Sequence, residues 1–252
     1  MSTLAAVIIT FNEEANLASC LESLSGTVDQ IIVLDSGSGD STLEIARLFG
    51  ATVAVSSDWH GFGNQKNQAL SMANTDWILS IDADERLTPE LAKEIRSVIN
   101  DTHASTCFSI PRRSWYCGRF IRFSGWSPDY VDRLFKNGMA HFSNDLVHER
   151  LLHLGPSKRL QNTLLHYSFR NFSQVLVKLD RYSTASAAQA YAKGKRANVY
   201  SAVCHGSWSF FRTFVLKGGF LDGSHGLALA ISNAEGTYYK YLKIWQMGQI
   251  SN

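Results

Sequence analysis

Two aspartates close an apolar stretch of this chain. Asp82 and Asp84 follow directly on Trp77–Ile81, with Ala83 between them. If the backbone stays extended there, both carboxylates point the same way and repel each other unless a cation lies beside them. Oxygen ligands select Mg²⁺ or Mn²⁺, and Mg²⁺ keeps open positions that substrate phosphates fill. The pair therefore indicates a metal ion that clamps a diphosphate.

Polar residues also end two earlier apolar runs. Leu4–Thr10 leads into Asn12, and Gln30–Asp35 leads into a glycine- and serine-rich turn. In open α/β sheets, ligands bind beyond the carboxyl ends of the strands, so we expect these groups to lie near Asp82. An ordinary strand-end turn is the alternative for each group taken alone, because Asp, Ser and Asn favour such positions.

A glycine-bearing segment, Gly61–Lys66, resembles a phosphate loop of the G-x-G type. It lacks the third glycine, which argues against a dinucleotide site. Lys66 would still reach a diphosphate as a point charge, with a solvent-facing lysine as the alternative. A D-x-D phosphatase motif is disfavoured, since Arg86 occupies the position that this motif gives to Thr or Val.

The first hundred residues alternate between apolar runs and helical patterns. The predicted strands are Leu4–Thr10, Gln30–Asp35, Ala51–Val55 and Trp77–Ile81. The predicted helices span 13–24, 41–49 and 88–99, and residues 61–72 hold a glycine-bearing loop that runs into a further helix. Ser41 and Glu44 form a capping box for the helix at 41–49, and Pro89 lies in the first turn of the helix at 88–99. This order predicts βαβ units and a mostly parallel sheet.

The rhythm changes after about residue 104. Predicted strands follow one another without long helices, at Thr106–Arg112, Arg119–Phe123, Val131–Lys136 and Thr163–Tyr167. A helix is expected over Phe172–Tyr191, followed by an aromatic, basic tail. We therefore expect a sheet domain at 1–170, with halves at 1–104 and 105–170, and a helical C-terminal appendage at 171–252.

Composition indicates a folded chain. The 252 residues are 45% hydrophobic and 18% charged, and no apolar run approaches the roughly 18 residues of a membrane span. The start has no basic region before its apolar stretch, so we expect no secretory signal. Four scattered cysteines without a C-x-x-C predict neither a zinc site nor a disulfide framework, but reduced thiols in a cytoplasmic protein.

Charge is unevenly distributed. Residues 1–100 hold 5 basic and 14 acidic residues, a net charge of −9, whereas residues 101–252 hold 19 and 8, a net charge of +11. This asymmetry favours an anionic partner for the second half, such as nucleic acid, a phosphorylated glycan or a lipid surface. Solvated helix faces are the alternative, and no nucleic-acid-binding motif is present.

Four segments in order resemble the first half of a family 2 glycosyltransferase of the GT-A fold: VIITFNEE, IIVLDSGSGDST, NQKNQAL and ILSIDADERL. RLFKNG, DLVHERL and LLHYSF stand where that family has acceptor-side elements, so the resemblance covers about residues 3–170. The tail is similar to lipopolysaccharide core β-glucosyltransferases of the WaaE/KdtX type. The implied fold is α/β: a Rossmann-like, mostly parallel mixed sheet flanked by helices.

The resemblance also implies roles for individual residues. The nucleotide-sugar segment would comprise Thr10, Phe11, Asn12, Glu14, Asp35, Lys66, Asp82, Ala83 and Asp84. Within it, Thr10 and Phe11 hold the base, Asp35 stands where many members have a base-binding acid, and Lys66 helps to place the donor. Asp82 matches the ribose-side acid, Asp84 the metal ligand, and His166 a histidine that approaches the metal or diphosphate.

Glu149 matches the acid that opens a helix after the acceptor loop and acts as the base. Inverting transfer needs such a group to take the acceptor hydroxyl proton, while a cation offsets the charge of the leaving diphosphate. A neutral imidazole is a plausible ligand, more readily for Mn²⁺ than for Mg²⁺. The alternatives are a surface acid paired with Arg150 or His148 for Glu149, and a core histidine for His166.

The predicted function is metal-dependent inverting transfer of glucose from UDP-glucose to a heptose of the lipopolysaccharide inner core. A nucleotidyltransferase acting on a sugar phosphate is one alternative, although no glycine-rich basic loop follows the first strand. A non-catalytic glycan-binding envelope module is another. Residues 171–252 carry 9 basic and 3 acidic residues among many aromatics. They predict peripheral association with the cytoplasmic face of the inner membrane, or alternatively simple packing of the appendage.

Overall fold

A computed structural model describes residues 1–252 except 57, 102–104, 144–148 and 251–252. The chain forms two compact units. The first comprises Met1–Arg112 and Asp129–His166, and the second comprises Arg113–Pro128 and Tyr167–Asn252. The second unit thus takes in a segment from the middle of the sequence as well as the C-terminal part.

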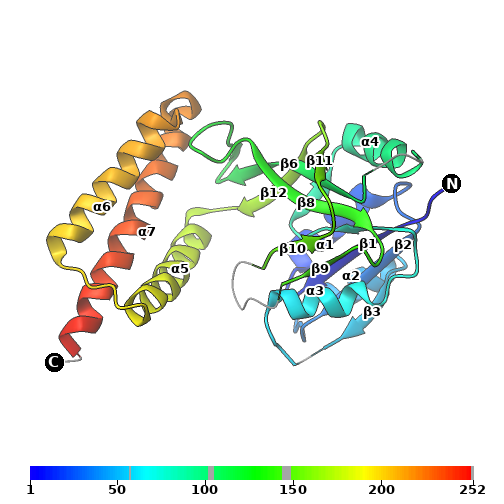
Figure 1. Cartoon of the computed structure of the whole chain (residues 1–252), viewed down its shortest axis with the longest axis horizontal. Helices are drawn as coiled ribbons and strands as arrows, with labels where there is room; N and C mark the ends of the chain where they lie inside the picture. The colour runs from blue at the N-terminus through cyan, green and yellow to red at the C-terminus, as the bar shows by residue number, and fades with distance from the viewer. Residues whose placement is uncertain (57, 102–104, 144–148, 251–252) are drawn as a thin grey trace. The chain divides into compact units, whose positions relative to one another are not determined.

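Four parallel strands form one side of the main sheet: β1 (Leu4–Thr10), β2 (Gln30–Asp35), β3 (Thr52–Val55) and β4 (Trp77–Ser80). Their order is β3-β2-β1-β4, and β8 (Asp129–Lys136) then joins β4 antiparallel. The sheet continues through β6 (Cys107–Tyr116), β12 (Leu164–Phe169) and β5 (Glu85–Leu87). The predicted mixed, mostly α/β architecture is confirmed (Figure 1).

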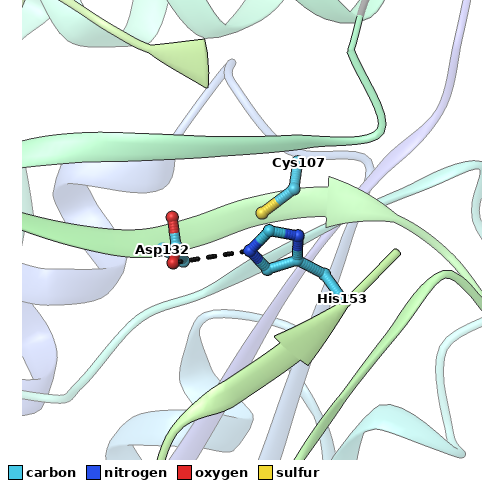
Figure 2. A group of neighbouring side chains, drawn as sticks. All are labelled: Cys107, Asp132 and His153. Carbon is cyan, nitrogen blue, oxygen red and sulfur yellow. Dashed lines mark ion pairs between the residues drawn. The ribbon is translucent and has the colours of Figure 1, made fainter. Parts of the chain in front are cut away.

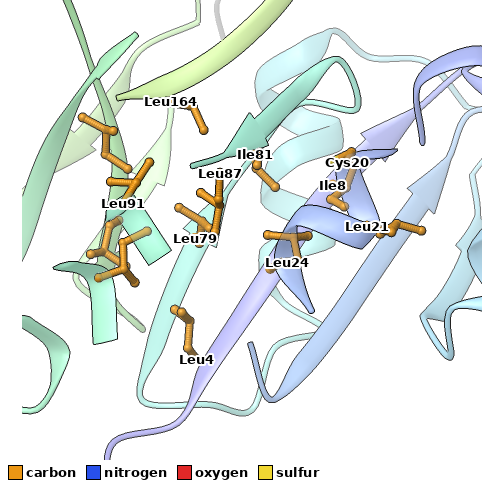
Figure 3. Packing of buried hydrophobic residues seen from close by; sticks show 14 of the residues in the cluster. Leu4, Ile8, Cys20, Leu21, Leu24, Leu79, Ile81, Leu87, Leu91 and Leu164 are labelled. Carbon is orange, nitrogen blue, oxygen red and sulfur yellow. The ribbon is translucent and has the colours of Figure 1, made fainter. Parts of the chain in front are cut away.

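Four helices flank the parallel strands: α1 (Glu14–Leu24), α2 (Thr42–Leu48), α3 (Phe62–Leu70) and α4 (Pro89–Ile99). Alternate residues of β1 point to opposite faces of the sheet. Leu4 and Ile8 pack in a cluster with residues of α1, α2 and α4, as Figure 3 shows in part, whereas Val7 packs in a second cluster with Ala69 of α3. Burial of β1 on both faces explains its unbroken apolar sequence.

Helix starts follow the predicted signals in one case and not in another. Thr88 caps α4 by accepting a hydrogen bond from the Leu91 amide at 3.2 Å. The capping box predicted at Ser41 is wrong, because the Ser41 side chain makes no capping hydrogen bond. Asp40 instead accepts from the Thr42 amide at 3.0 Å, which satisfies one of the free donors of α2.

Five short strands complete the sheets: β5, β7 (Arg119–Phe120), β9 (Ala140–Phe142), β10 (Leu151–His153) and β11 (Ser157–Arg159). Glu85, the third acid after the apolar stretch 77–81, begins β5. The strand predicted over Arg119–Phe123 is confined to β7. β9 and β10 pair with each other as a separate two-stranded sheet.

The second unit is mainly helical. It contains α5 (Phe172–Ala192), α6 (Val199–Phe211), a π-helical turn η1 (Arg212–Leu216), a 3₁₀ turn η2 (Gly219–Asp222) and α7 (Gly223–Ile250). The buried carboxylate of Asp222 accepts from the amides of Arg122 and Phe123, at 3.0 and 2.9 Å, and so fastens the 113–128 segment to the helices. Among the described residues, no helix has the length and apolarity needed to span a bilayer.

Candidate active site

The structure brings together two residues predicted to bind metal. The Nε2 atom of His166 lies 3.3 Å from Oδ2 of Asp84, although 82 positions separate them in sequence. β5 and β12 explain the contact, because they pair antiparallel with His166 opposite Glu85. Asp84 directly precedes β5, so its carboxylate comes to the imidazole.

Asp82 lies in a network of buried cations. Its carboxylate forms ion pairs with Arg133 of β8 and with Nζ of Lys66, the latter at 3.2 Å. Burial opposes ionisation of Asp82, but the charges of Arg133 and Lys66 outweigh it and hold the pKa of Asp82 well below its usual range. Burial likewise opposes the charge of Arg133, but the carboxylates of Asp82 and Glu85 outweigh it and raise the pKa of Arg133. Asp82 is therefore charged throughout the neutral range.

Lys66 is a buried residue and not the solvent-facing lysine considered as its alternative. It is 6% exposed, its Nζ lies 3.0 Å from Oε1 of Glu149, and it stands over the ring of Phe142. Through Asp82 and Glu149, Lys66 links the predicted donor side of the site to the predicted base. A single ammonium group thus neutralises part of two facing carboxylates.

Glu149 does not open a helix, which corrects the expectation from the family pattern. It stands in an irregular stretch two residues before β10. Residues 145–148 of the DLVHERL segment, including the alternative partner His148, lie outside the described residues. The backbone on the carboxyl side of Glu149 is still fixed, because the Ser143 amide donates to the Arg150 carbonyl oxygen at 2.9 Å.

A cavity of about 420 Å³ lies beside these groups. Its lining is mostly charged and includes Lys66, Asp82, Arg112, Asp132, Arg133 and Glu149. A pocket of this size and polarity suits a charged or sugar-like ligand better than an apolar one.

Glu85 is a site residue that the sequence did not assign. Its side chain is fully buried, accepts from Nη2 of Arg133 at 2.8 Å, and also accepts from the Asp82 amide at 3.0 Å. Arg112 lies 3.4 Å away. Glu85 thus fixes both the backbone of Asp82 and the guanidinium that faces it. The signal for Glu85 in the sequence is that it is the third acid within four positions, because a buried acid needs a positively charged partner.

Asp35 and Thr10 meet at the ends of β2 and β1. The Thr10 hydroxyl donates to Oδ2 of Asp35 at 2.8 Å, and Oδ1 of Asp35 accepts from the amides of Gly37 and Ser38. Asp35 is fully buried, and its carboxylate closes the turn after β2. In contrast, Phe11 is 59% exposed and presents its ring at this edge.

Asn12 and Glu14 fasten the neighbouring loop. The side-chain oxygen of Asn12 accepts from the Gly39 amide at 2.9 Å, and Oε2 of Glu14 accepts from the Ser41 amide at 3.1 Å. These bonds join the start of α1 to the loop before α2. Both residues therefore shape the edge where Phe11 is exposed.

Gly63 shows why the GFG segment carries glycine. A Cβ atom at Gly63 would stand 1.9 Å from the backbone oxygen of Ser143 and 3.5 Å from Cβ of Glu149. No real side chain tolerates the first distance, so α3 approaches the chain near Glu149 only because residue 63 is glycine. The glycine serves close packing here, and not the phosphate loop that its spacing resembles.

The sequence model described as "Glycosyl transferase family 2" matches residues 5–160, well over half of the chain. The chain belongs to this family. It is therefore a transferase enzyme, and the ordered strand-end motifs that suggested family 2 fall within the matched region. The non-catalytic and nucleotidyltransferase alternatives are accordingly disfavoured.

Curated relatives named as glycosyltransferases match almost the whole chain. An uncharacterized glycosyltransferase of Rickettsia typhi is 28% identical over 262 residues, which cover 100% of this chain and 88% of the relative. The lipopolysaccharide core biosynthesis glycosyltransferase LpsC of Rhizobium meliloti is 28% identical over 254 residues, covering 96% and 92%. The resemblance to lipopolysaccharide core transferases thus extends through the C-terminal helices.

Solved structures overlap with this chain over a smaller part. S. aureus TarS, crystallised with UDP-GlcNAc, is 25% identical with a TM-score of 0.41, over 50% of this chain and 38% of that one. Glucosyl-3-phosphoglycerate synthase of Mycobacterium tuberculosis, with Mn²⁺, UDP and its product, is 26% identical with a TM-score of 0.37, over 45% and 44%. The matched region thus spans less than half the length of either structure.

Proposed function

We propose that this family 2 enzyme transfers glucose from UDP-glucose to a heptose of the lipopolysaccharide inner core, with inversion and with Mg²⁺ or Mn²⁺. The observation that carries the proposal is the joining of Asp84 with His166 beside the Asp82–Lys66–Glu149 network. The 28% identity to a lipopolysaccharide core transferase over 96% of the chain supports the acceptor class.

The donor side fits a divalent ion. A carboxylate and an imidazole that already lie 3.3 Å apart offer one oxygen and one nitrogen ligand, a set that suits Mn²⁺ and tolerates Mg²⁺. When bound, the ion would offset the negative charge that develops on the leaving UDP. Asp82 would bind the ribose side, and Lys66 would add a fixed positive charge close to the diphosphate.

Glu149 is the proposed base on the acceptor side. Glu149 would take the proton of the acceptor hydroxyl. The hydroxyl oxygen would meanwhile bond to the anomeric carbon of the donor sugar as the bond from that carbon to UDP breaks. Its ion pair with Lys66 orients the carboxylate at 3.0 Å. At the nucleotide edge, the exposed ring of Phe11 would stack on the base, with Thr10 held in place by Asp35.

Thermal stabilisation by UDP-, GDP- and dTDP-sugars with Mn²⁺ tests the donor. UDP-glucose at 100 times its dissociation constant should stabilise the protein by about 2.7 kcal/mol. The Asp84→Asn variant should lose the part of this stabilisation that depends on Mn²⁺. The Asp58→Asn variant, which changes an exposed acid, should keep it. Transfer that releases pyrophosphate and no UDP, or wild-type transfer by Asp84→Asn, would refute the proposal.

The second unit would bind the membrane that holds the acceptor. One side of α6 exposes Tyr200, Val203, Trp208 and Phe211, and exposed Arg196, Arg212 and Lys217 lie near its two ends in sequence. Apolar and cationic side chains presented together are typical of helices that lie in a lipid interface. This arrangement supports peripheral binding to an anionic cytoplasmic leaflet.

Flotation with vesicles tests the membrane contact. The protein should float with vesicles that contain anionic lipid and less with neutral ones, and Trp208→Ser should weaken flotation severalfold because it removes buried apolar area. Trp59→Ser is the matched control, since Trp59 is a half-exposed tryptophan of the first unit. Equal flotation of both variants and the wild type would place the contact elsewhere.

A further inference from the structure

Three potential metal ligands converge within the first unit, apart from the Asp84–His166 contact. Cys107 comes from β6, Asp132 from β8 and His153 from β10, and one ligand atom of each lies within 4.8 Å of the other two. Figure 2 shows the Cys107 sulfur beside the imidazole and the Asp132 carboxylate facing it. Among the described residues this is the one such group of three or more acidic, histidine or cysteine side chains.

The contacts of His153 leave its imidazole poorly satisfied. Nδ1 is buried and has no hydrogen-bond partner among the described residues. On the other side of the ring, Nε2 lies 3.7 Å from Oδ2 of Asp132, which is too long for a hydrogen bond. It is close to the roughly 3.3 Å that separates a nitrogen and an oxygen bound to one tetrahedral zinc ion at 2.0–2.1 Å.

The Asp132 carboxylate is held in place for such a contact. Ser157 of β11 donates to Oδ1 of Asp132 at 2.7 Å, and β11 pairs parallel to β6 with Ser157 beside Cys107. Oδ2 is thereby turned toward the histidine. A hydrogen bond to the second oxygen of a ligating carboxylate is the usual support of a protein metal site.

The Cys107 side chain is fully buried next to a negative charge. Burial, and then the nearby Asp132, raise the pKa of Cys107 to about 11. A thiol, a carboxylate and an imidazole in one small space offer sulfur, oxygen and nitrogen ligands, with the thiol proton released to solvent when a metal binds. A soft or borderline cation would bind all three, whereas Mg²⁺ would not select the sulfur.

We propose that Cys107, Asp132 and His153 bind a zinc ion, with a fourth position left for water or a bound ligand. The ion would join β10 to β6 and β8. β10 begins two residues after Glu149, and Asp132 also lines the charged cavity, so zinc would stiffen the acceptor side of that cavity. The inference rests on these three strands and not on the transfer reaction.

X-ray absorption at the zinc edge tests the site on the intact wild-type protein. After loading with one equivalent of Zn²⁺, we expect one sulfur neighbour at about 2.3 Å together with nitrogen and oxygen at about 2.0–2.1 Å. Cobalt substitution should likewise give a thiolate-to-metal charge-transfer band. Because no variant is involved, a folding defect cannot produce this result.

Variants test whether Cys107 supplies the sulfur ligand of the metal. Cys107→Ser should abolish the cobalt thiolate band and lower the zinc content from about one ion per chain to near none. Cys20→Ser is the matched control, since Cys20 is also fully buried and its sulfur lies 3.7 Å from the backbone oxygen of Asp82, at the predicted donor site. Asp84→Asn should leave the band intact, which separates this site from the metal that accompanies UDP-glucose.

Two outcomes would overturn the proposal. A zinc environment of nitrogen and oxygen alone would show that Cys107 is not a ligand. If Cys20→Ser removes the thiolate band and Cys107→Ser leaves it, then Cys20 is the ligand and the metal binds on the donor side. The near-isosteric Asp132→Asn, checked for wild-type circular dichroism, should weaken zinc binding at least tenfold, and unchanged affinity would also count against the site.

Discussion

Glu149→Gln is expected to lower the rate of sugar transfer by about 10²–10⁴-fold, because glutamine cannot accept the proton of the acceptor hydroxyl. The amide oxygen of glutamine can still accept a hydrogen bond from Lys66, so the side chain should keep its place. Donor binding should be retained, since the substituted side chain would still hold Lys66, and the other proposed donor contacts lie on Asp82, Asp84 and Phe11. The measurement is kcat with UDP-glucose and lipopolysaccharide core acceptor, alongside thermal stabilisation by UDP-glucose.

Glu90→Gln is the matched control, because Glu90 is an exposed acid in the first turn of α4. It should transfer sugar at the wild-type rate. If Glu149→Gln also transfers at that rate, another group is the base. If the variant instead loses stabilisation by UDP-glucose, then Glu149 acts in donor binding through Lys66 and not in proton transfer.

Arg133→Met is expected to destabilise the protein by about 3–5 kcal/mol. Arg133 is 6% exposed and pairs with Asp82 and with the fully buried Glu85, so the substitution leaves a buried carboxylate without its main cation. The measurement is the midpoint of urea unfolding. Lowering the pH should narrow the difference in unfolding free energy, since Arg133 holds the pKa of Asp82 below its usual range and this stabilisation is lost as the pH falls.

Two further variants define the origin of this effect. Arg47→Met changes an exposed arginine of α2 and should shift stability by no more than about 0.5 kcal/mol. Adding Glu85→Gln to Arg133→Met should recover part of the lost stability, because it removes the buried carboxylate that has lost its cation. Strictly additive losses would show that Arg133 acts through packing and not through its ion pairs.

Much of the parallel half of the fold was predictable from sequence. β1 and β2 have the predicted limits, and α4 begins as its Thr-Pro start indicates. These elements are encoded locally: β1 is apolar on both faces, and the capping group of α4 stands next to the helix it caps. Local rules suffice where the signal and the structure occupy the same few residues.

Other elements depend on partners far away in the sequence. Nothing in Glu85–Leu87 marks a strand, because β5 exists through its pairing with β12. Glu149 was expected to open a helix by analogy, but the chain there turns into β10 and packs beside Gly63. Such positions are decided by tertiary contacts, which propensity does not contain.

The candidate zinc ligands show the same limit for sites. Cysteine spacing argued against zinc, since that rule reads only pairs of cysteines close in sequence. Cys107 and Asp132 stand on the paired strands β6 and β8, whereas His153 comes from the separate β9–β10 sheet, so only the tertiary fold brings the three together. Conversely, the sequence did predict Asp84 and His166 as one site, on the strength of family resemblance and not of spacing.

The pairing of β5 with β12 also bears on when the enzyme becomes active during synthesis. The parallel strands and their helices are complete by residue 99, so a nascent chain of that length already holds most of the first hydrophobic cluster. His166 emerges from the ribosome later and must close a long loop onto Asp84, a non-local step that slows folding. A ribosome-bound chain would therefore complete the proposed donor site only after its core, which would delay sugar transfer until β12 has paired with β5.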